Sequence, residues 1–154
     1  MKIKKILSEE CILDNLKATS KYEVIAELAA PLIQKYKDLD PEEVVKVLLD
    51  REELGSTGIG EGVAIPHGKL KSSQQVIAVF GRSITGVPFN CHDDKLAHFF
   101  LVLLAPESMT GHHLQILARL SKIFKGSHFR SKLLKAKTAL EIYDNIITED
   151  EKLL

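Results

Sequence analysis

Hydrophobic residues recur at helical intervals in two segments near the start of the chain. Ser20 and Glu23 have the spacing of a capping box, which predicts a helix that Pro31 should kink or end. A second helix is predicted to begin after Asp40, a good N-cap residue, and to end at Gly55. The first third of the chain is therefore expected to form two amphipathic helices.

Short apolar runs predict the strands. Residues 11–13 are expected to form an edge strand and residues 63–65 and 76–81 two further strands, with a turn over residues 86–88. Residues 96–104 are apolar enough to form a central strand that is buried on both faces.

The last third of the chain again has a helical pattern. Thr110 can cap one helix, another should begin near Ser127, and residues 138–141 have capping-box spacing. The apolar positions of the first of these helices are Leu114, Leu117, Leu120 and Phe124. Because helices flank a few strands, the predicted fold class is an α/β sandwich.

The composition is that of an ordinary globular protein, with 45% apolar and 27% charged residues, and one domain is expected over residues 1–154. The 21 Lys and Arg balance the 21 Asp and Glu, so neither nucleic acid nor an anionic membrane is an expected partner, although a local basic patch stays open. The longest apolar run, residues 99–105, is too short for stable membrane insertion. With no secretion signal and two cysteines expected to be reduced thiols, a cytoplasmic location is expected.

Residues 55–62 contain four glycines, which predicts a loop with unusual backbone angles or a closely approaching ligand. The backbone N–H groups around Gly58 and the hydroxyls of Ser56 and Thr57 suit an anion. Neither the Walker pattern nor the dinucleotide GxGxxG pattern is present. The loop therefore suits a phosphoryl group but has no nucleotide-binding signature.

His67 stands between Pro66 and Gly68, directly after a predicted strand. Proline stiffens the approach and glycine leaves space beside the ring, so the imidazole is expected on an exposed turn, where α/β folds place their ligands. Histidine is nucleophilic near neutral pH and can be phosphorylated or bind a metal. The alternative is a turn histidine that only caps a carbonyl group. Arg51 can place two hydrogen bonds on phosphate oxygens, unless it is only a solvated helix-end cation.

Two adjacent histidines lie near the start of the helix predicted after Thr110. His113 falls in its first turn, where the positive helix end would lower its pKa and attract anions. A neutral His113 could donate from Nε2–H to a phosphoryl oxygen on His67. Alternatively, one of the two adjacent histidines is merely solvated, which we expect of His112.

Residues 91–94, Cys-His-Asp-Asp, raise the question of a metal site. Neighbouring residues in a strand or turn point in diverging directions, and no metal-ligand spacing supports a site. We therefore expect no metal and no cofactor. His98 is expected to be a satisfied core histidine and His128 a solvated one.

The segment over residues 51–68, REELGSTGIGEGVAIPHG, closely resembles the active-site segment of type-2 IIA proteins. These proteins belong to the bacterial phosphoenolpyruvate-dependent sugar phosphotransferase system (PTS), in its fructose, mannitol and nitrogen-regulatory branch. The resemblance extends over nearly the whole chain, and a chain of this length is most similar to the nitrogen-regulatory member. One departure is Asp93-Asp94, where relatives usually have Asp-Gly.

The resemblance implies a three-layer α/β/α sandwich with a mixed sheet. It implies that Nε2 of His67 accepts a phosphoryl group from the phosphohistidine carrier HPr, or its nitrogen-branch paralogue, while Nδ1–H is held by a backbone carbonyl. Arg51 matches the arginine beside that site, and His113 matches the second active-site histidine. Transfer between two imidazoles needs no metal where the protein supplies positive charge and N–H donors.

Three functions remain open. The leading expectation is a phosphotransferase component, a phosphohistidine carrier whose phosphorylation state controls partner proteins in nitrogen-type regulation. The alternatives are a sugar-transport IIA that passes the phosphoryl group to a IIB cysteine, and a non-catalytic anion-binding module. The joint presence of Arg51, His67 and His113 argues against the last. An apolar docking patch beside the histidines is expected from Ile59 and Met109.

Overall fold

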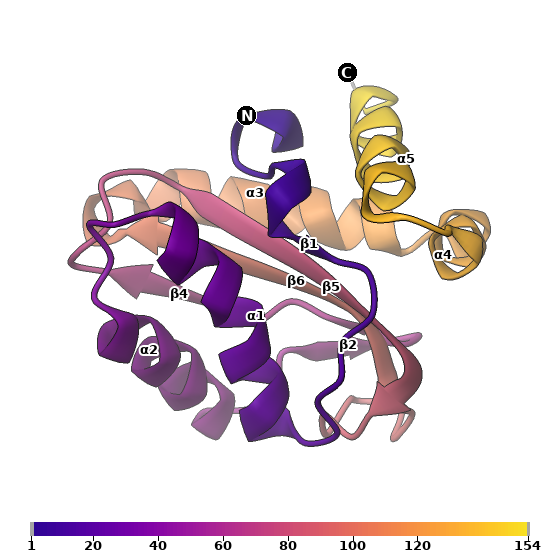
Figure 1. Ribbon diagram of the computed structural model, residues 1–154, viewed down its shortest axis with the longest axis horizontal. Helices are drawn as coiled ribbons and strands as arrows, with labels where there is room; N and C mark the ends of the chain where they lie inside the picture. Colours follow the sequence, from indigo (N-terminus) through magenta and orange to yellow (C-terminus); the bar gives the residue numbers. More distant parts are fainter. Residues whose placement is uncertain (1, 154) are drawn as a thin grey trace.

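In the computed structural model, which describes residues 2–153, a mixed sheet lies between helical layers (Figure 1). Helices α1 (Lys21–Lys35) and α2 (Pro41–Glu53) cover one face of the sheet. Helix α3 (Thr110–Phe124) covers the other, and α4 (Ser127–Lys135) and α5 (Ala139–Glu151) follow at one side. The predicted α/β/α fold with a mixed sheet is confirmed.

The sheet is built around strand β6, which pairs with three other strands. Its strands are β1 (Ile12–Leu13), β2 (Gly58–Gly60), β3 (Val63–Ala64), β4 (His67–Leu70), β5 (Ile77–Val87) and β6 (Ala97–Pro106). The path runs β1-β5-β6-β3-β2, and β4 also pairs with β6. Strand β5 is antiparallel to β6, whereas β3 and β4 are parallel to it. Because β6 is buried along nearly its whole length, the predicted central strand is confirmed.

The predicted helix starts agree with the structure where a local cap defines them. The side chains of Ser20, Asp40 and Thr138 each accept a hydrogen bond from a backbone N–H in the following turn. Helix α1 does not end at Pro31, however, and continues to Lys35. Proline costs the helix a hydrogen bond, but it lies close to the C-terminal end, where little helix remains to be lost.

Five local predictions were wrong. The glycine-rich segment contains strand β2, and residues 86–87 continue β5 where a turn was predicted. Thr110 is the first residue of α3 and not its cap, and Leu114 is exposed where a core position was predicted. His67, predicted to lie on a turn, begins strand β4, whose residues His-Gly-Lys-Leu carry no strand pattern of their own.

The turn before β6 explains the Asp-Asp sequence found there. Asp94 has φ +61°, a left-handed conformation in which glycine carries no penalty and aspartate is tolerated. The carboxylate of Asp93 supports this turn by accepting the N–H groups of Glu61 (2.9 Å) and Lys95 (3.1 Å). A glycine, which the resemblance implies at residue 94, is therefore not required for this turn.

Buried charged residues fasten the C-terminal helices to the rest of the fold. Asp150 of α5 accepts the N–H of Ile3 (2.9 Å) and pairs with Arg119 of α3 (2.5 Å). Arg82 of β5 donates to the carbonyl oxygens of Leu133 (2.8 Å) and Ala136 (2.5 Å) near the end of α4. These contacts tie α3, which carries His113, to α5, and tie the end of α4 to strand β5.

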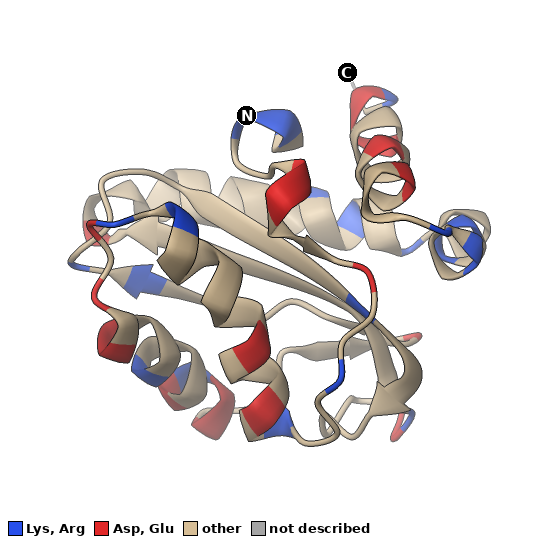
Figure 2. Cartoon of the chain, in the orientation of Figure 1, with Lys and Arg blue, Asp and Glu red and all other residues tan. Residues whose placement is uncertain are grey.

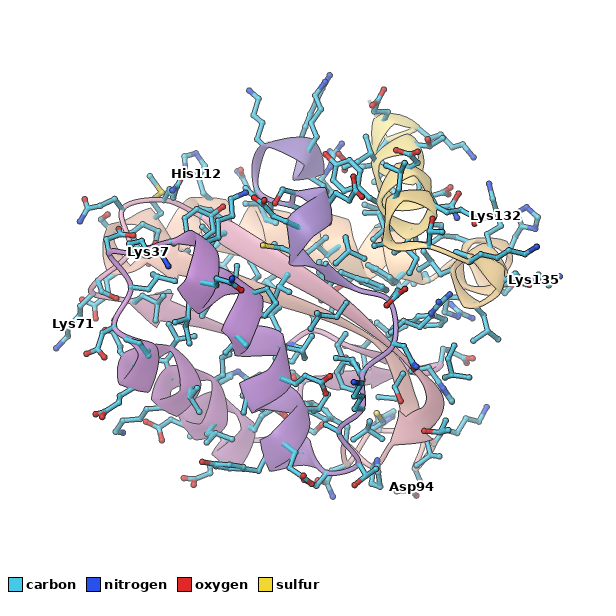
Figure 3. All side chains as sticks on the ribbon, viewed as in Figure 1. Lys37, Lys71, Asp94, His112, Lys132 and Lys135 are labelled. Atoms are coloured by element: carbon cyan, nitrogen blue, oxygen red, sulfur yellow. The ribbon has the colours of Figure 1, made fainter. Side chains whose placement is uncertain are left out.

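Although the net charge is zero, the charged residues are distributed unevenly over the structure. Residues 108–140 contain neither Asp nor Glu, and α4 carries Lys and Arg while α5 carries several acidic residues (Figure 2). Lys132 and Lys135 point outward from α4 (Figure 3). A local basic surface, left open by the composition, is therefore present on α4. Among residues 2–153, no helix is both long and apolar enough to cross a membrane.

Candidate functional site

A cavity of about 630 Å³ lies where α2, β4 and α3 meet. Its polar wall consists of Asp50, which pairs with Lys46, and of Arg51, Glu53, His67, Lys69 and His113; its apolar wall consists of Val47, Leu54, Leu114 and Leu117. Three of the predicted site residues, which are far apart in the sequence, are thus brought together. Gly68 also lines this cavity, whereas Ser56, Thr57 and Gly58 do not.

His67 is the first residue of β4 and is half-buried, so the prediction of an exposed turn was wrong. Its Nδ1 lies 2.7 Å from the carbonyl oxygen of Ile65. Because a carbonyl oxygen only accepts, Nδ1 carries the proton and Nε2 keeps the lone pair. Burial lowers the pKa of His67, and the positive charge of Arg51 lowers it further against the opposing effect of the carbonyl bond. The ring is therefore neutral and nucleophilic at pH 7.

His113 lies on α3 beside His67, with 5.5 Å between the two ring centroids. The side chain is buried, and within residues 2–153 its Nε2 has no hydrogen-bond partner. Burial, followed by the charges of His67 and Lys69, lowers the pKa of His113 to about 4. A buried, unpartnered nitrogen at the wall of a cavity calls for a ligand atom as its partner. His112 is exposed and points outward, as predicted (Figure 3).

Two cations flank the paired imidazoles. Arg51 is held at the end of α2 by a hydrogen bond from Nη1 to the carbonyl oxygen of Gly55 (2.8 Å). Lys69 Nζ donates to the hydroxyl of Thr110 at the start of α3 (3.0 Å). Lys69 was not selected from the sequence as a site residue, although a signal was present. It follows His67 by two positions, and alternate residues of a strand share a face.

The glycine after His67 is required by packing. A Cβ on Gly68 would lie 2.2 Å from Cγ1 of Val47 on α2, so a side chain here would force Val47, or α2 with it, to shift away from β4. Since α2 carries Arg51 and β4 carries His67, this close contact sets the spacing between the two site residues.

The polar groups of the glycine-rich segment are already engaged within the protein. The hydroxyl of Ser56 donates to the carbonyl oxygen of Phe89 (2.6 Å) and accepts the N–H of Gly58 (3.0 Å). The hydroxyl and the N–H of Thr57 both donate to the carboxylate of Glu52. These groups therefore stabilise the glycine-rich segment through bonds within the protein, and they do not face the cavity.

The other residues considered in the sequence lie outside the paired histidines. His98 is satisfied, since its Nδ1 lies 2.9 Å from the carbonyl oxygen of Ser83, but it is half-buried and not in the core as predicted; His128 is exposed. In the described part of the chain, no three His, Cys, Asp or Glu side chains are grouped to hold a metal ion. The predicted patch of Ile59 and Met109 does not line the cavity, since Ile59 is exposed and Met109 half-buried outside it; the exposed Leu54 and Leu114 do line it.

Paired neutral imidazoles between two cations, on the edge of an α/β sheet, define a protein suited to binding an anionic group at a histidine. A family model described as "Phosphoenolpyruvate-dependent sugar phosphotransferase system, EIIA 2" matches residues 5–149. The chain belongs to this family and is a PTS IIA type-2 phosphocarrier domain, a component of a phosphotransferase.

Individual relatives come from both branches of the family. A nitrogen regulatory protein of Bradyrhizobium diazoefficiens is 36% identical over 93% of this chain and 93% of its own length. The fructose-specific EIIABC component of Bacillus subtilis is also 36% identical, over 99% of this chain and 24% of its own length. The crystal structure of nitrogen regulatory protein IIA-Ntr from Neisseria meningitidis has a TM-score of 0.88 and 33% identity, covering 94% of this chain and 98% of that one. Sequence identity alone does not separate the two branches.

The burial of His113 predicts a pH dependence of stability. In the unfolded chain His113 takes up a proton near pH 6.5, but in the folded protein only near pH 4. Between these values the unfolded state binds more protons, so stability falls as the pH falls. Compared with His113→Gln, the wild-type protein is expected to lose up to about 3 kcal/mol between pH 7 and pH 4. Urea unfolding of both proteins at several pH values measures this, and a pH-independent difference between them contradicts it.

Proposed function

We propose that the protein carries a phosphoryl group on Nε2 of His67, which it accepts from a phosphorylated HPr-like carrier in the cytoplasm. The observation that carries this proposal is the hydrogen bond from Nδ1 to the carbonyl oxygen of Ile65, which leaves the Nε2 lone pair available. We further propose that the phosphorylation state controls partner binding in nitrogen-type regulation. This part is supported by the similarity to nitrogen regulatory proteins along nearly their whole length.

The transfer follows from the positions of the side chains. The lone pair on Nε2 of His67 attacks phosphorus, the P–N bond of the donor breaks, and its electron pair returns to the donor ring. No proton has to leave His67, because Nδ1–H stays bonded to the carbonyl of Ile65. Arg51 and Lys69 supply positive charge to the phosphoryl oxygens, and neutral His113 donates to one of them from Nε2–H.

Incubation with phosphoenolpyruvate, enzyme I and HPr tests the proposal directly. We expect one phosphoryl group per chain by intact-mass spectrometry, stable in alkali and labile in acid. An unmodified protein, under conditions where HPr itself is phosphorylated, overturns the proposal and favours a non-catalytic anion-binding module.

A second candidate function is a sugar-transport IIA component that passes the phosphoryl group to a IIB cysteine. It is favoured by the equal identity to the fructose-specific EIIABC component. Mixing the phosphorylated protein with isolated fructose- and mannitol-type IIB domains distinguishes the two. Rapid loss of the phosphoryl group to a IIB domain favours sugar transport, and its retention favours the regulatory function.

Leu114 gives a test of carrier docking. This side chain is 62% exposed at the apolar wall of the cavity, so a carrier that reaches His67 must cover it. Leu114→Asp places a negative charge where an anionic phosphoryl group arrives, and we expect the KM for the phosphorylated carrier to rise about tenfold. Steady-state kinetics at varied carrier concentration measure this change.

The matched control is Leu140→Asp, because Leu140 is 49% exposed on α5 and does not line the cavity. It should leave the KM unchanged. If Leu114→Asp also leaves it unchanged, the carrier docks elsewhere.

A further inference from the structure

A buried carboxylate lies next to the site without lining the cavity. Glu52, on the last turn of α2, has a side chain that is only 3% exposed. Its Oε1 accepts the N–H of Thr57 (3.1 Å) and pairs with Lys21 Nζ (3.2 Å), while Oε2 accepts the Thr57 hydroxyl. Both polar donors of Thr57 are therefore directed at one buried anion, which holds this residue firmly in place.

From Thr57 the contacts lead directly to the reacting imidazole. The carbonyl oxygen of Thr57 accepts the N–H of Ile65 (3.0 Å), and the carbonyl oxygen of Ile65 accepts Nδ1–H of His67 (2.7 Å). Thr57 and Ile65 are both buried, so solvent does not compete for these bonds. A continuous series of hydrogen bonds thus connects the Glu52 carboxylate to Nδ1 of His67.

The Ile65 carbonyl depends on this support more than most carbonyl groups do. Residue 66 is proline, so the peptide that carries the carbonyl has no N–H with which to fix its own orientation. It is held from its two ends, by the bond of Ile65 N–H to Thr57 and by the bond of Leu103 N–H to the Pro66 carbonyl (3.0 Å). Loosening the first of these bonds frees the carbonyl to turn away from Nδ1.

We propose that Glu52 and Thr57 are positioning residues that keep the proton of His67 on Nδ1. Their effect on phosphoryl transfer rests on the proposed function, whereas their effect on the tautomer does not. When the proton moves to Nε2, no lone pair is left there to form the new P–N bond, and that fraction of the protein cannot accept a phosphoryl group. Holding the carbonyl in place therefore sets the reactive fraction of His67.

The test is Thr57→Val, which keeps the shape of the side chain and removes its hydroxyl. In the unphosphorylated protein, ¹⁵N chemical shifts of the His67 ring report the tautomer. We expect the Nδ1–H form in the wild-type protein and in Thr57→Ser, and a mixture of tautomers in Thr57→Val. The rate of phosphoryl acceptance from the carrier is expected to fall about tenfold in Thr57→Val and to be restored in Thr57→Ser.

Two further variants provide a matched control and a second test of the proposal. Thr138→Val makes the same chemical change at the cap of α5, and it should leave the His67 tautomer and the acceptance rate unchanged. Glu52→Gln keeps the shape of the carboxylate but not its charge, and it serves if Thr57→Val does not fold. Weaker bonds to Thr57 should then give the same two changes at smaller size, with a lower pKa of His67 because the nearby negative charge is gone.

The possible results distinguish a failure of this inference from a failure of the proposed function. A wild-type tautomer ratio in both Thr57→Val and Glu52→Gln overturns the inference, and a shifted ratio with an unchanged acceptance rate overturns its link to phosphoryl transfer. If the wild-type protein accepts no phosphoryl group, the proposed function fails, and the tautomer measurement still decides whether Glu52 and Thr57 position the ring.

Discussion

Replacing His67 by alanine is expected to abolish phosphoryl acceptance and to leave the fold intact. No other side chain of the cavity combines a neutral imidazole with a bonded Nδ1 and an available Nε2. The backbone pairing of β4 with Leu103 does not involve the imidazole, and the ring is half-buried at an open cavity. Loss of its bond to the buried Ile65 carbonyl should therefore lower the free energy of unfolding by about 1–3 kcal/mol, too little to unfold the protein.

The measurement is intact-mass spectrometry after incubation with phosphoenolpyruvate, enzyme I and the carrier, together with urea unfolding. His112→Ala is the matched control, since this exposed histidine is near the site in sequence and points outward (Figure 3). It should accept one phosphoryl group at the normal yield. A normal adduct on the His67→Ala protein would place the acceptor on another residue.

Replacing His113 by alanine is expected to slow transfer to and from the carrier by about 100-fold, with the acceptor still in place. Removing one hydrogen-bond donor to a developing charge costs other enzymes about 10²–10³ in rate. A donor open to water would cost less, but Nε2 of His113 is buried and has no partner among residues 2–153. Low dielectric strengthens the bond it makes to a phosphoryl oxygen.

Rapid-mixing measurements of forward and reverse transfer check this expectation. His112→Ala again serves as the control and should have wild-type rates. His113→Gln retains an N–H donor and should recover part of the loss. Wild-type rates in both directions for His113→Ala would show that His113 takes no part in phosphoryl transfer.

Local signals were enough to predict the helices and the long strand. The caps at Ser20, Asp40 and Thr138 act within one turn, and the apolar run of β6 requires burial whatever packs against it. Strand β4 could not be predicted in this way. Its residues form a strand because the edge of β6 offers them backbone partners, and this partnership is not encoded in the segment itself.

The residues of the site were likewise predicted only in part. Arg51, His67 and His113 were selected because their side chains suit phosphoryl chemistry, and all three line the cavity. Ser56, Thr57 and Gly58 were also predicted to bind the phosphoryl group. Their contacts, however, are made with residues outside this segment, which the local pattern does not show. A Cβ on Gly58 would lie 2.5 Å from Cys91 Sγ, so glycine stands there to allow packing. The sequence reveals which groups can react, whereas tertiary contacts decide which of them support the framework.

The apolar wall beside His67 has a consequence for signalling under the proposed function. A target protein that covers Leu54 and Leu114 would bury the phosphoryl group against apolar side chains, and it would therefore favour the unphosphorylated form. Thermodynamic reciprocity requires that the bound target reduce the affinity of His67 for the phosphoryl group by the same factor. At a high concentration of the target, phosphoryl groups would therefore return to the carrier. The phosphorylation level of this protein would then depend on the concentration of the target.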